Sequence, residues 1–111
     1  MLRIGSDGSI RLTRGDTARL NVSITNEANS NDYVLQPDDT LTMTVKKTIS
    51  DAEPAIQKIL TGTNAFHIEP KDTAGLEFGK YIYDVQLSTG SGDVYTVIEP
   101  TSFEIMQEVT C

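Results

Sequence analysis

Apolar and polar residues alternate along several short stretches of this chain, and that period of two constrains the fold more than any other feature. In ARLNVSIT, residues 18–25, the side chains of Leu20, Val22 and Ile24 share one face. TLTMTVKK, KYIYDVQL, DVYTVI and SFEIM repeat the pattern. Such alternation, rich in β-branched and aromatic residues, is typical of strands with one buried face. It predicts about seven strands, near residues 9–13, 17–25, 40–47, 55–60, 65–69, 79–88 and 93–106.

Prolines and turn residues separate these stretches. Proline cannot donate a hydrogen bond to a sheet, and Pro100 is expected to divide the last strand into two pieces around a kink. PKDTAGL, residues 70–76, is the one stretch that suits a short turn of helix, with Asp72 as its capping residue. STGSGD, residues 88–93, predicts the tip of a hairpin, and NEANSNDY, residues 26–33, predicts a long polar loop.

The length of 111 residues predicts a single domain, residues 1–111, with its core at about 9–107. A sheet with one apolar face must bury that face against another layer. Two stacked sheets predict an all-β fold, an immunoglobulin-like antiparallel β-sandwich of about seven strands. In such sandwiches a tyrosine at one corner often donates its hydroxyl to upstream backbone, and Tyr81 is the candidate. Plain core packing of Tyr81 is the alternative.

Charge and segment composition exclude several classes of partner. The formal net charge of −7 disfavours nucleic acid and anionic lipid, because both are polyanions. The first ten residues lack the apolar core of a signal peptide, and no apolar run approaches the length of a membrane span. We therefore expect a chain that is cytoplasmic when synthesised and is not secreted by a signal peptide. Cys111 is the single cysteine, so no internal disulfide can form.

Two sequence motifs have simpler explanations than the function they suggest. Arg14-Gly15-Asp16 matches a cell-adhesion tripeptide, but glycine and aspartate between two strands predict a turn. Asn21-Val22-Ser23 matches a glycosylation acceptor, but it lies in the middle of a predicted strand. Both motifs act outside the cell, and no secretion signal accompanies them.

Catalytic and metal-binding constellations are not recognisable in the sequence. His67 is the single histidine, and it alternates outward between Phe66 and Ile68. Together with Cys111 it falls short of the three or four ligands that zinc needs. Oxygen-bearing side chains that suit calcium occur at Asn29, Asn31, Asp32, Asp38 and Asp39, without the ordered spacing of a calcium loop. No acid, base and nucleophile converge. We therefore expect no enzyme and assign no catalytic, cofactor-binding or metal-binding residue.

Charge is distributed unevenly along the sequence. The first nineteen residues are rich in arginine, and the last thirteen contain glutamates but no base: Arg3, Arg11, Arg14 and Arg19 against Glu99, Glu104 and Glu108. Two explanations remain open, pairing within one chain and complementarity between copies in a ring. The strand edges near Ile10–Thr13 and Phe103–Met106 are expected to accept an added strand from a partner.

Four stretches, taken in order, resemble a recurring phage and prophage domain: IRLTRGDTARLNVSIT, LTMTVKKTISDAEPAIQKIL, FHIEPKDTAGLEFGKYIYDVQL and VYTVIEPTSFEI. They are similar to the immunoglobulin-like N-terminal domain of phage baseplate upper proteins, from about Ile10 to Ile105. The resemblance implies a non-enzymatic structural or interaction domain of a phage particle, in the tail or baseplate and therefore virion-associated. Its implied partners are other phage structural proteins and further copies of itself. It supplies no catalytic residue.

A carbohydrate or cell-surface ligand-binding module is the alternative function. Such sites usually line up aromatic side chains on an exposed face. The chain has no Trp, and its tyrosines are mostly in phase with the core. Exposure of Tyr33, Tyr83 and Tyr95 together would favour this alternative.

Overall fold

The computed structural model describes residues 3–4, 8–26 and 31–107, and within them the chain is mostly β with almost no helix. The elements are β1 (Arg3–Ile4), β2 (Ile10–Thr13), β3 (Ala18–Asn21), β4 (Thr25–Asn26), β5 (Asn31–Asp32), β6 (Thr40–Lys46), β7 (Ile56–Thr61), β8 (Ala65–Ile68), α1 (Pro70–Thr73), β9 (Gly79–Ser88) and β10 (Val94–Met106). Six of the predicted strands are present with small shifts at their ends. The predicted strand at 17–25 is instead divided into β3 and β4.

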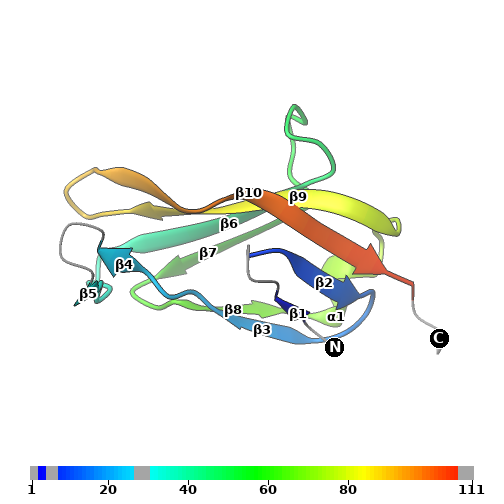
Figure 1. The fold of residues 1–111 in the computed structure, drawn as a ribbon, viewed down its shortest axis with the longest axis horizontal. Coiled ribbons are helices and arrows are strands. Elements are labelled where there is room, and N and C mark those ends of the chain that lie inside the picture. The colour runs from blue at the N-terminus through cyan, green and yellow to red at the C-terminus, as the bar shows by residue number, and fades with distance from the viewer. Residues whose placement is uncertain (1–2, 5–7, 27–30, 108–111) are drawn as a thin grey trace.

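The strands form one large sheet and two small ones. The large sheet has the order β1-β2-β10-β9-β6-β7, while β3 pairs with β8 and β4 with β5. Figure 1 shows the upper strands of the large sheet as one layer, with β3 and β8 as a second layer below. The large sheet curls, so that β1 and β2 lie between these layers in this view.

The prediction of a purely antiparallel arrangement is wrong at one position. β2 runs parallel to β10, with Ile10 opposite Phe103 and Thr13 opposite Met106. The other pairs of the large sheet are antiparallel. The turn after β2 passes the chain to the second layer, so β2 pairs with β10 and β3 pairs with β8. This crossing between layers requires tertiary contacts that the alternation of residues does not encode.

The core lies between the two layers and is built by the alternation. In β6 the buried residues Leu41, Met43 and Val45 alternate with threonines on the outer face. The rings of Tyr83 and Phe103 meet edge to face at a centroid distance of 5.8 Å. The second layer contributes residues from β3 and β8 to the same cluster: Ala18, Leu20, Phe66 and Ile68. The apolar residues that alternate along the strands of both layers thus form one continuous core.

β10 is one long strand and does not break into two at Pro100. Its pairing with β9 shifts register between Thr96 and Ile98 and again between Ile98 and Thr101. The second irregularity spans Pro100, which has no amide hydrogen to donate, and the first lies just before it. The strand therefore bends around proline while its ladder continues on both sides.

One end of the molecule is closed by α1 and by Tyr81. Asp72 caps the helix as predicted, but from its third position: its Oδ2 accepts from the Glu69 amide at 2.7 Å. The Tyr81 hydroxyl donates to the Glu77 carbonyl at 2.9 Å, and Tyr81 is only 6% exposed. The predicted bond to upstream backbone is confirmed, and the ring packs in the core as well.

Candidate functional site

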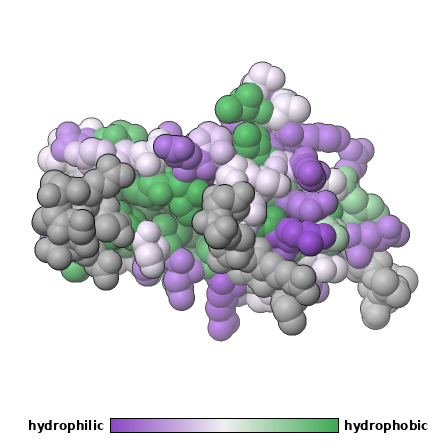
Figure 2. Space-filling view, in the orientation of Figure 1, coloured by the Kyte–Doolittle hydropathy of each residue, from purple (hydrophilic) through white to green (hydrophobic). Residues whose placement is uncertain are grey.

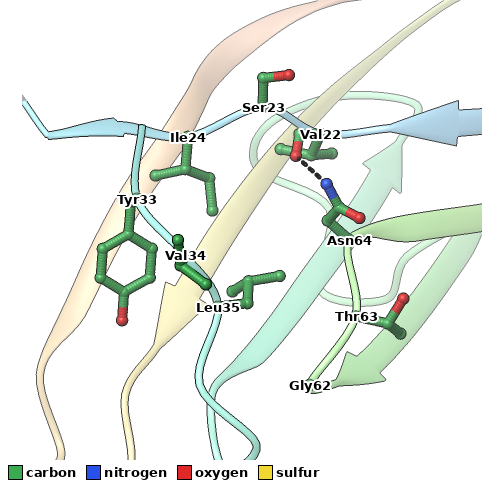
Figure 3. Close-up of a pocket in the computed structure, with 9 residues that line it drawn as sticks. All are labelled: Val22, Ser23, Ile24, Tyr33, Val34, Leu35, Gly62, Thr63 and Asn64. Atoms are coloured by element: carbon green, nitrogen blue, oxygen red, sulfur yellow. Dashed lines mark hydrogen bonds between the residues drawn. The ribbon is translucent and has the colours of Figure 1, made fainter. Parts of the chain in front are cut away.

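An open recess lies at the opposite end of the molecule, beyond β3 and the start of β8. Three short segments line it, residues 22–24, 33–35 and 62–64, and it encloses about 400 Å³. Figure 3 shows Ile24, Val34 and Leu35 turned toward the space between these segments, with strands of the large sheet passing behind. We name this space the recess.

Backbone hydrogen bonds hold the frame of the recess. The Val22 amide donates to the Asn64 carbonyl at 3.0 Å, and the Asn64 side-chain Nδ2 donates back to the Val22 carbonyl at 2.8 Å. The Tyr33 amide donates to the Ile24 carbonyl at 2.7 Å. The Val22–Asn64 bonds extend the β3–β8 register by one pair, and beyond them the chain pairs through β4 with β5.

The recess presents apolar surface to solvent. Val22 is buried at its base, Ile24 and Leu35 are partly buried against the core, and Val34 is 73% exposed. Figure 2 shows hydrophobic surface in a hollow on the same half of the molecule. Val34 therefore adds exposed apolar surface to a hollow that also has polar lining groups, and concave surface of this mixed kind is typical of binding sites.

A buried carboxylate anchors one wall of the recess. Asp39 is 2% exposed, and its Oδ2 accepts from the Tyr33 hydroxyl at 2.6 Å and the Gln36 amide at 2.9 Å. The Asp39 carbonyl accepts from the Gly62 amide at 2.8 Å. The Tyr33 hydroxyl bond is the largest cause that lowers the pKa of Asp39, and the same bond raises the pKa of Tyr33. Asp39 therefore ties two of the three recess segments together.

This end of the molecule carries acidic residues. Asp38 and Asp39 precede β6, and Asp93 lies in the β9–β10 hairpin. The Asp38 carboxylate lies against Gly90 at the β9–β10 hairpin, where a β-carbon would come within 1.8 Å of its Oδ2. Pro37 lies against Gly62 in the same way. The recess therefore opens beside acidic side chains.

The Arg14-Gly15-Asp16 tripeptide is a turn at the closed end, as predicted. Gly15 has a φ of 85°, and the Asp16 amide donates to the Thr13 carbonyl at 3.0 Å. The Gly15 amide donates to the hydroxyl of buried Thr73 at 2.9 Å. The Arg14 guanidinium lies 4.2 Å from the Phe78 ring centroid. The arginine of the tripeptide thus packs on its own chain, where its Nη1 also donates to the Leu76 carbonyl at 3.3 Å.

Asn21 and His67 both lie at exposed positions on the second layer. Asn21 ends β3 opposite Ala65, and His67 faces outward on β8 opposite Arg19. The outward orientation predicted for His67 is confirmed. In the described part of the chain, no three His, Cys, Asp or Glu residues come together to hold a metal ion.

Several of the expected calcium ligands have other roles or lie outside the described residues. Asn29 falls outside them, as do Cys111 and Glu108. The backbone of Asn31–Asp32 forms β5, paired with β4. Asp39 is taken up by its protein hydrogen bonds.

The three tyrosines named as a ligand-binding possibility are not exposed together. Tyr83 is 2% exposed, and its hydroxyl donates to the Gly8 carbonyl. Tyr95 is 54% exposed on β10, while Tyr33 is half-buried at the recess. Only two of the three rings therefore reach solvent.

The two strand edges that were expected to accept a strand from a partner are already paired within the chain, so that prediction is wrong. Ile10–Thr13 and Phe103–Met106 pair with each other, and each has a further strand on its other side. Within the described residues, the free edges belong to β1, β7 and the two small sheets. The Arg11 Nε lies 3.2 Å from Glu104 Oε1, so at this pair the charges of the two ends of the sequence meet within one chain.

Comparisons with known proteins found no relative of this chain. No protein-family profile, no curated protein and no solved structure matches the chain. In the described part of the chain the helix α1 has four residues, far fewer than a helix needs to cross a bilayer.

Sequence reasoning missed the recess. It is assembled from three segments about ten to thirty residues apart, and none of them carries a motif. The stretches without Lys and Arg, residues 20–45 and 81–111, gave no signal of it, because they include strands that run along the large sheet and reach Tyr81 at the closed end.

Proposed function

We propose that this chain is a non-enzymatic structural and interaction domain of a phage or prophage particle, a component of the tail or baseplate. The observation that carries the interaction role is the recess, a hydrogen-bonded hollow with apolar and polar lining groups and an exposed valine at its rim. The phage assignment rests on the resemblance of Ile10–Ile105 to the first domain of baseplate upper proteins. The chain is made in the cytoplasm and joins other structural proteins in the virion.

The fold that we propose is an immunoglobulin-like sandwich. Its support is the core between two layers, the parallel β2–β10 pair closing one side, and the Tyr81 hydroxyl on the Glu77 backbone. A tyrosine at this corner is a hallmark of such sandwiches. A fold of this kind hosts many unrelated functions, so the site and not the fold supports the interaction role.

Particle association tests the phage proposal. Particles released from the strain that encodes the chain, after prophage induction, are banded in a density gradient and probed with antibody to the chain. We expect the chain to band with tailed particles and to remain there after washing in high salt. A chain found only among soluble proteins, while particle tails band without it, would refute the proposal.

A carbohydrate-binding module remains the second candidate, and one observation favours it. Tyr33 lines the recess, and Tyr95 is 54% exposed on β10. Exposed aromatic rings provide stacking surface for a sugar ring. A glycan array with the wild type and a Tyr95→Ala variant tests this. Binding that the variant loses supports the module, and the absence of any bound glycan argues against it.

A further inference from the structure

In the described part of the chain, β7 is the longest of the strands that lie at a sheet margin. It borders the large sheet beside β6 (Figure 1) and has six residues, whereas the other marginal strands have four or two. Such an edge presents backbone N–H and C=O groups to another strand, and proteins often protect it with proline or a bulge. β7 contains no proline, and its pairing with β6 runs without a register shift. Its edge is therefore open to a further strand.

The outward face of β7 has an apolar centre between polar ends. Gln57, Ile59 and Thr61 are the exposed residues of the strand, and Ile59 is 62% exposed. On the neighbouring strand Thr42 lies opposite Ile59, and Thr44 accepts from the Gln57 Nε2 at 3.3 Å. Ile59 thus lies at the middle of an open edge, where the side chain of an added strand would cover it.

The margin formed by β6 and β7 contains no acidic residue, although the chain has a formal net charge of −7. Residues 40–47 and 55–62 include no Asp or Glu. The one charged residue of β7 is Lys58, and its Nζ lies 2.8 Å from Asp72 Oδ2, so this charge is balanced within the chain. Two copies that meet along this margin therefore avoid the repulsion that acidic surfaces would cause.

The side chains of β7 suit pairing with the same strand of a second copy. Antiparallel pairing about Ile59 sets this residue opposite Ile59 of the second copy. Gln57 then lies opposite Thr61, and Lys58 lies opposite Leu60. The register thus joins two apolar side chains at its centre and an amide with a hydroxyl on either side, and it sets no like charges directly opposite. Pairing about Lys58 would set two lysines opposite each other, which is destabilising.

We propose that β7 of one copy pairs with β7 of a second copy, antiparallel about Ile59, so that the two large sheets join into one. The same strand contributes on both sides, so the contact has two-fold symmetry and closes at a dimer. The backbone ladder provides the binding, and the side chains select the register. The inference rests on the proposed structural role and names a second copy of the chain as a partner. One strand pair is a small contact, so we expect a weak dimer.

Matched lysine variants test the contact by sedimentation and light scattering in a Cys111→Ser background. The parent chain is studied from roughly 10 µM to roughly 1 mM, the range that suits a weak dimer. Ile59→Lys sets like charges opposite each other in the proposed dimer and should raise its dissociation constant at least about tenfold. Ile49→Lys is the control, because Ile49 is 69% exposed in the loop between β6 and β7. We expect it to dimerise like the parent, and circular dichroism checks the fold of each variant.

Cysteine substitutions in the same background test the register under mild oxidation. Ile59→Cys should form linked dimers faster than Ile49→Cys, and a mixture of Gln57→Cys with Thr61→Cys should link faster than either variant alone. A dissociation constant that Ile59→Lys leaves unchanged, or linkage of Ile59→Cys no faster than the control, would overturn the proposal.

The oligomeric state and the particle test can fail separately. A parent chain that stays monomeric up to about 1 mM would overturn self-pairing and leave a strand of another protein as the occupant of the edge. Monomers that still band with particles would leave the phage role standing. Dimers that never band with particles would refute the phage role alone.

Discussion

The two ends of this molecule each hold a carboxylate in hydrogen bonds, yet they neutralise it differently. At the closed end, Asp72 Oδ2 lies 2.8 Å from Lys58 Nζ and accepts from the Glu69 amide. At the recess end, Asp39 accepts only from neutral groups among its described partners, the Tyr33 hydroxyl and backbone amides. Neutral donors add no net charge, so they stabilise the Asp39 carboxylate without cancelling its negative charge. The closed end thus balances its carboxylate with a lysine, whereas the recess end holds its buried carboxylate with neutral donors.

The pKa values of these two carboxyls shift in the same direction for different reasons. Burial acts most strongly on Asp72 and raises its pKa, but the Lys58 ammonium, the Glu69 amide and nearby lysines outweigh it, so that the pKa is lowered. For Asp39, the Tyr33 hydroxyl and the Gln36 amide are the leading causes of a lowered pKa. Acid should therefore weaken both ends, and substitutions can separate them.

The largest expected effect tests whether stability resides in the shared core and not at the recess. Phe103→Ala removes a fully buried ring that packs on Tyr83, and we expect a loss of about 3–5 kcal/mol in the free energy of unfolding. Val34→Ala, at the recess rim, should change it by less than about 0.5 kcal/mol. Urea denaturation measures both. Equal losses would contradict the division of the molecule into a stabilising core and an open surface.

The second effect concerns pH and the recess wall. The folded pKa of Asp39 lies below its ordinary value of 3.8, so its contribution to stability is present above that pH and is lost as pH falls below it. We expect Asp39→Asn to be less stable than the wild type at pH 7, and the gap between them to narrow between pH 4 and pH 2. Chemical denaturation across that range is the measurement. A stability difference that does not change with pH would show that the charge of the Asp39 carboxylate does not stabilise the fold.

The third effect sharpens the comparison at the closed end. Tyr81→Phe removes the hydroxyl that bonds the Glu77 carbonyl and should cost about 1 kcal/mol in the free energy of unfolding. Tyr95→Phe is the matched control, because Tyr95 is exposed at the other end. We expect no measurable change in the free energy of unfolding for Tyr95→Phe. A larger loss for Tyr95→Phe than for Tyr81→Phe would contradict the assignment of the stabilising hydroxyl to the closed end.

The smallest effect comes from the surface ion pair between the two neighbouring parallel strands. Arg11 and Glu104 are 53% and 28% exposed, so the Arg11→Gln and Glu104→Gln variants and their double variant should show a coupling energy below about 0.5 kcal/mol. A double-mutant cycle in thermal unfolding measures it. A coupling several times larger would mean that charge, and not the backbone ladder, joins β2 to β10.

The alternation of residues predicted the strands well and the partners of those strands poorly. Leu41, Met43 and Val45 are buried as their spacing indicates, because a pleated strand must turn alternate side chains to one face. Tyr81 and the turn at Gly15 were also predictable, since local chain geometry and chemistry decide both. The parallel pairing of β2 with β10 was not, because the pattern within a strand carries no information about the direction of its neighbour.

What the sequence determined by itself is local: which segments are extended, where they turn, which faces are apolar, and that residues 20–45 and 81–111 carry no base. Only the tertiary structure decided that Val22, Val34 and Asn64 surround one hollow. The physical reason is the distance along the sequence over which each effect acts. Torsion preferences and side-chain alternation act within a few residues, whereas a recess forms where segments distant in sequence pack together and leave space between them.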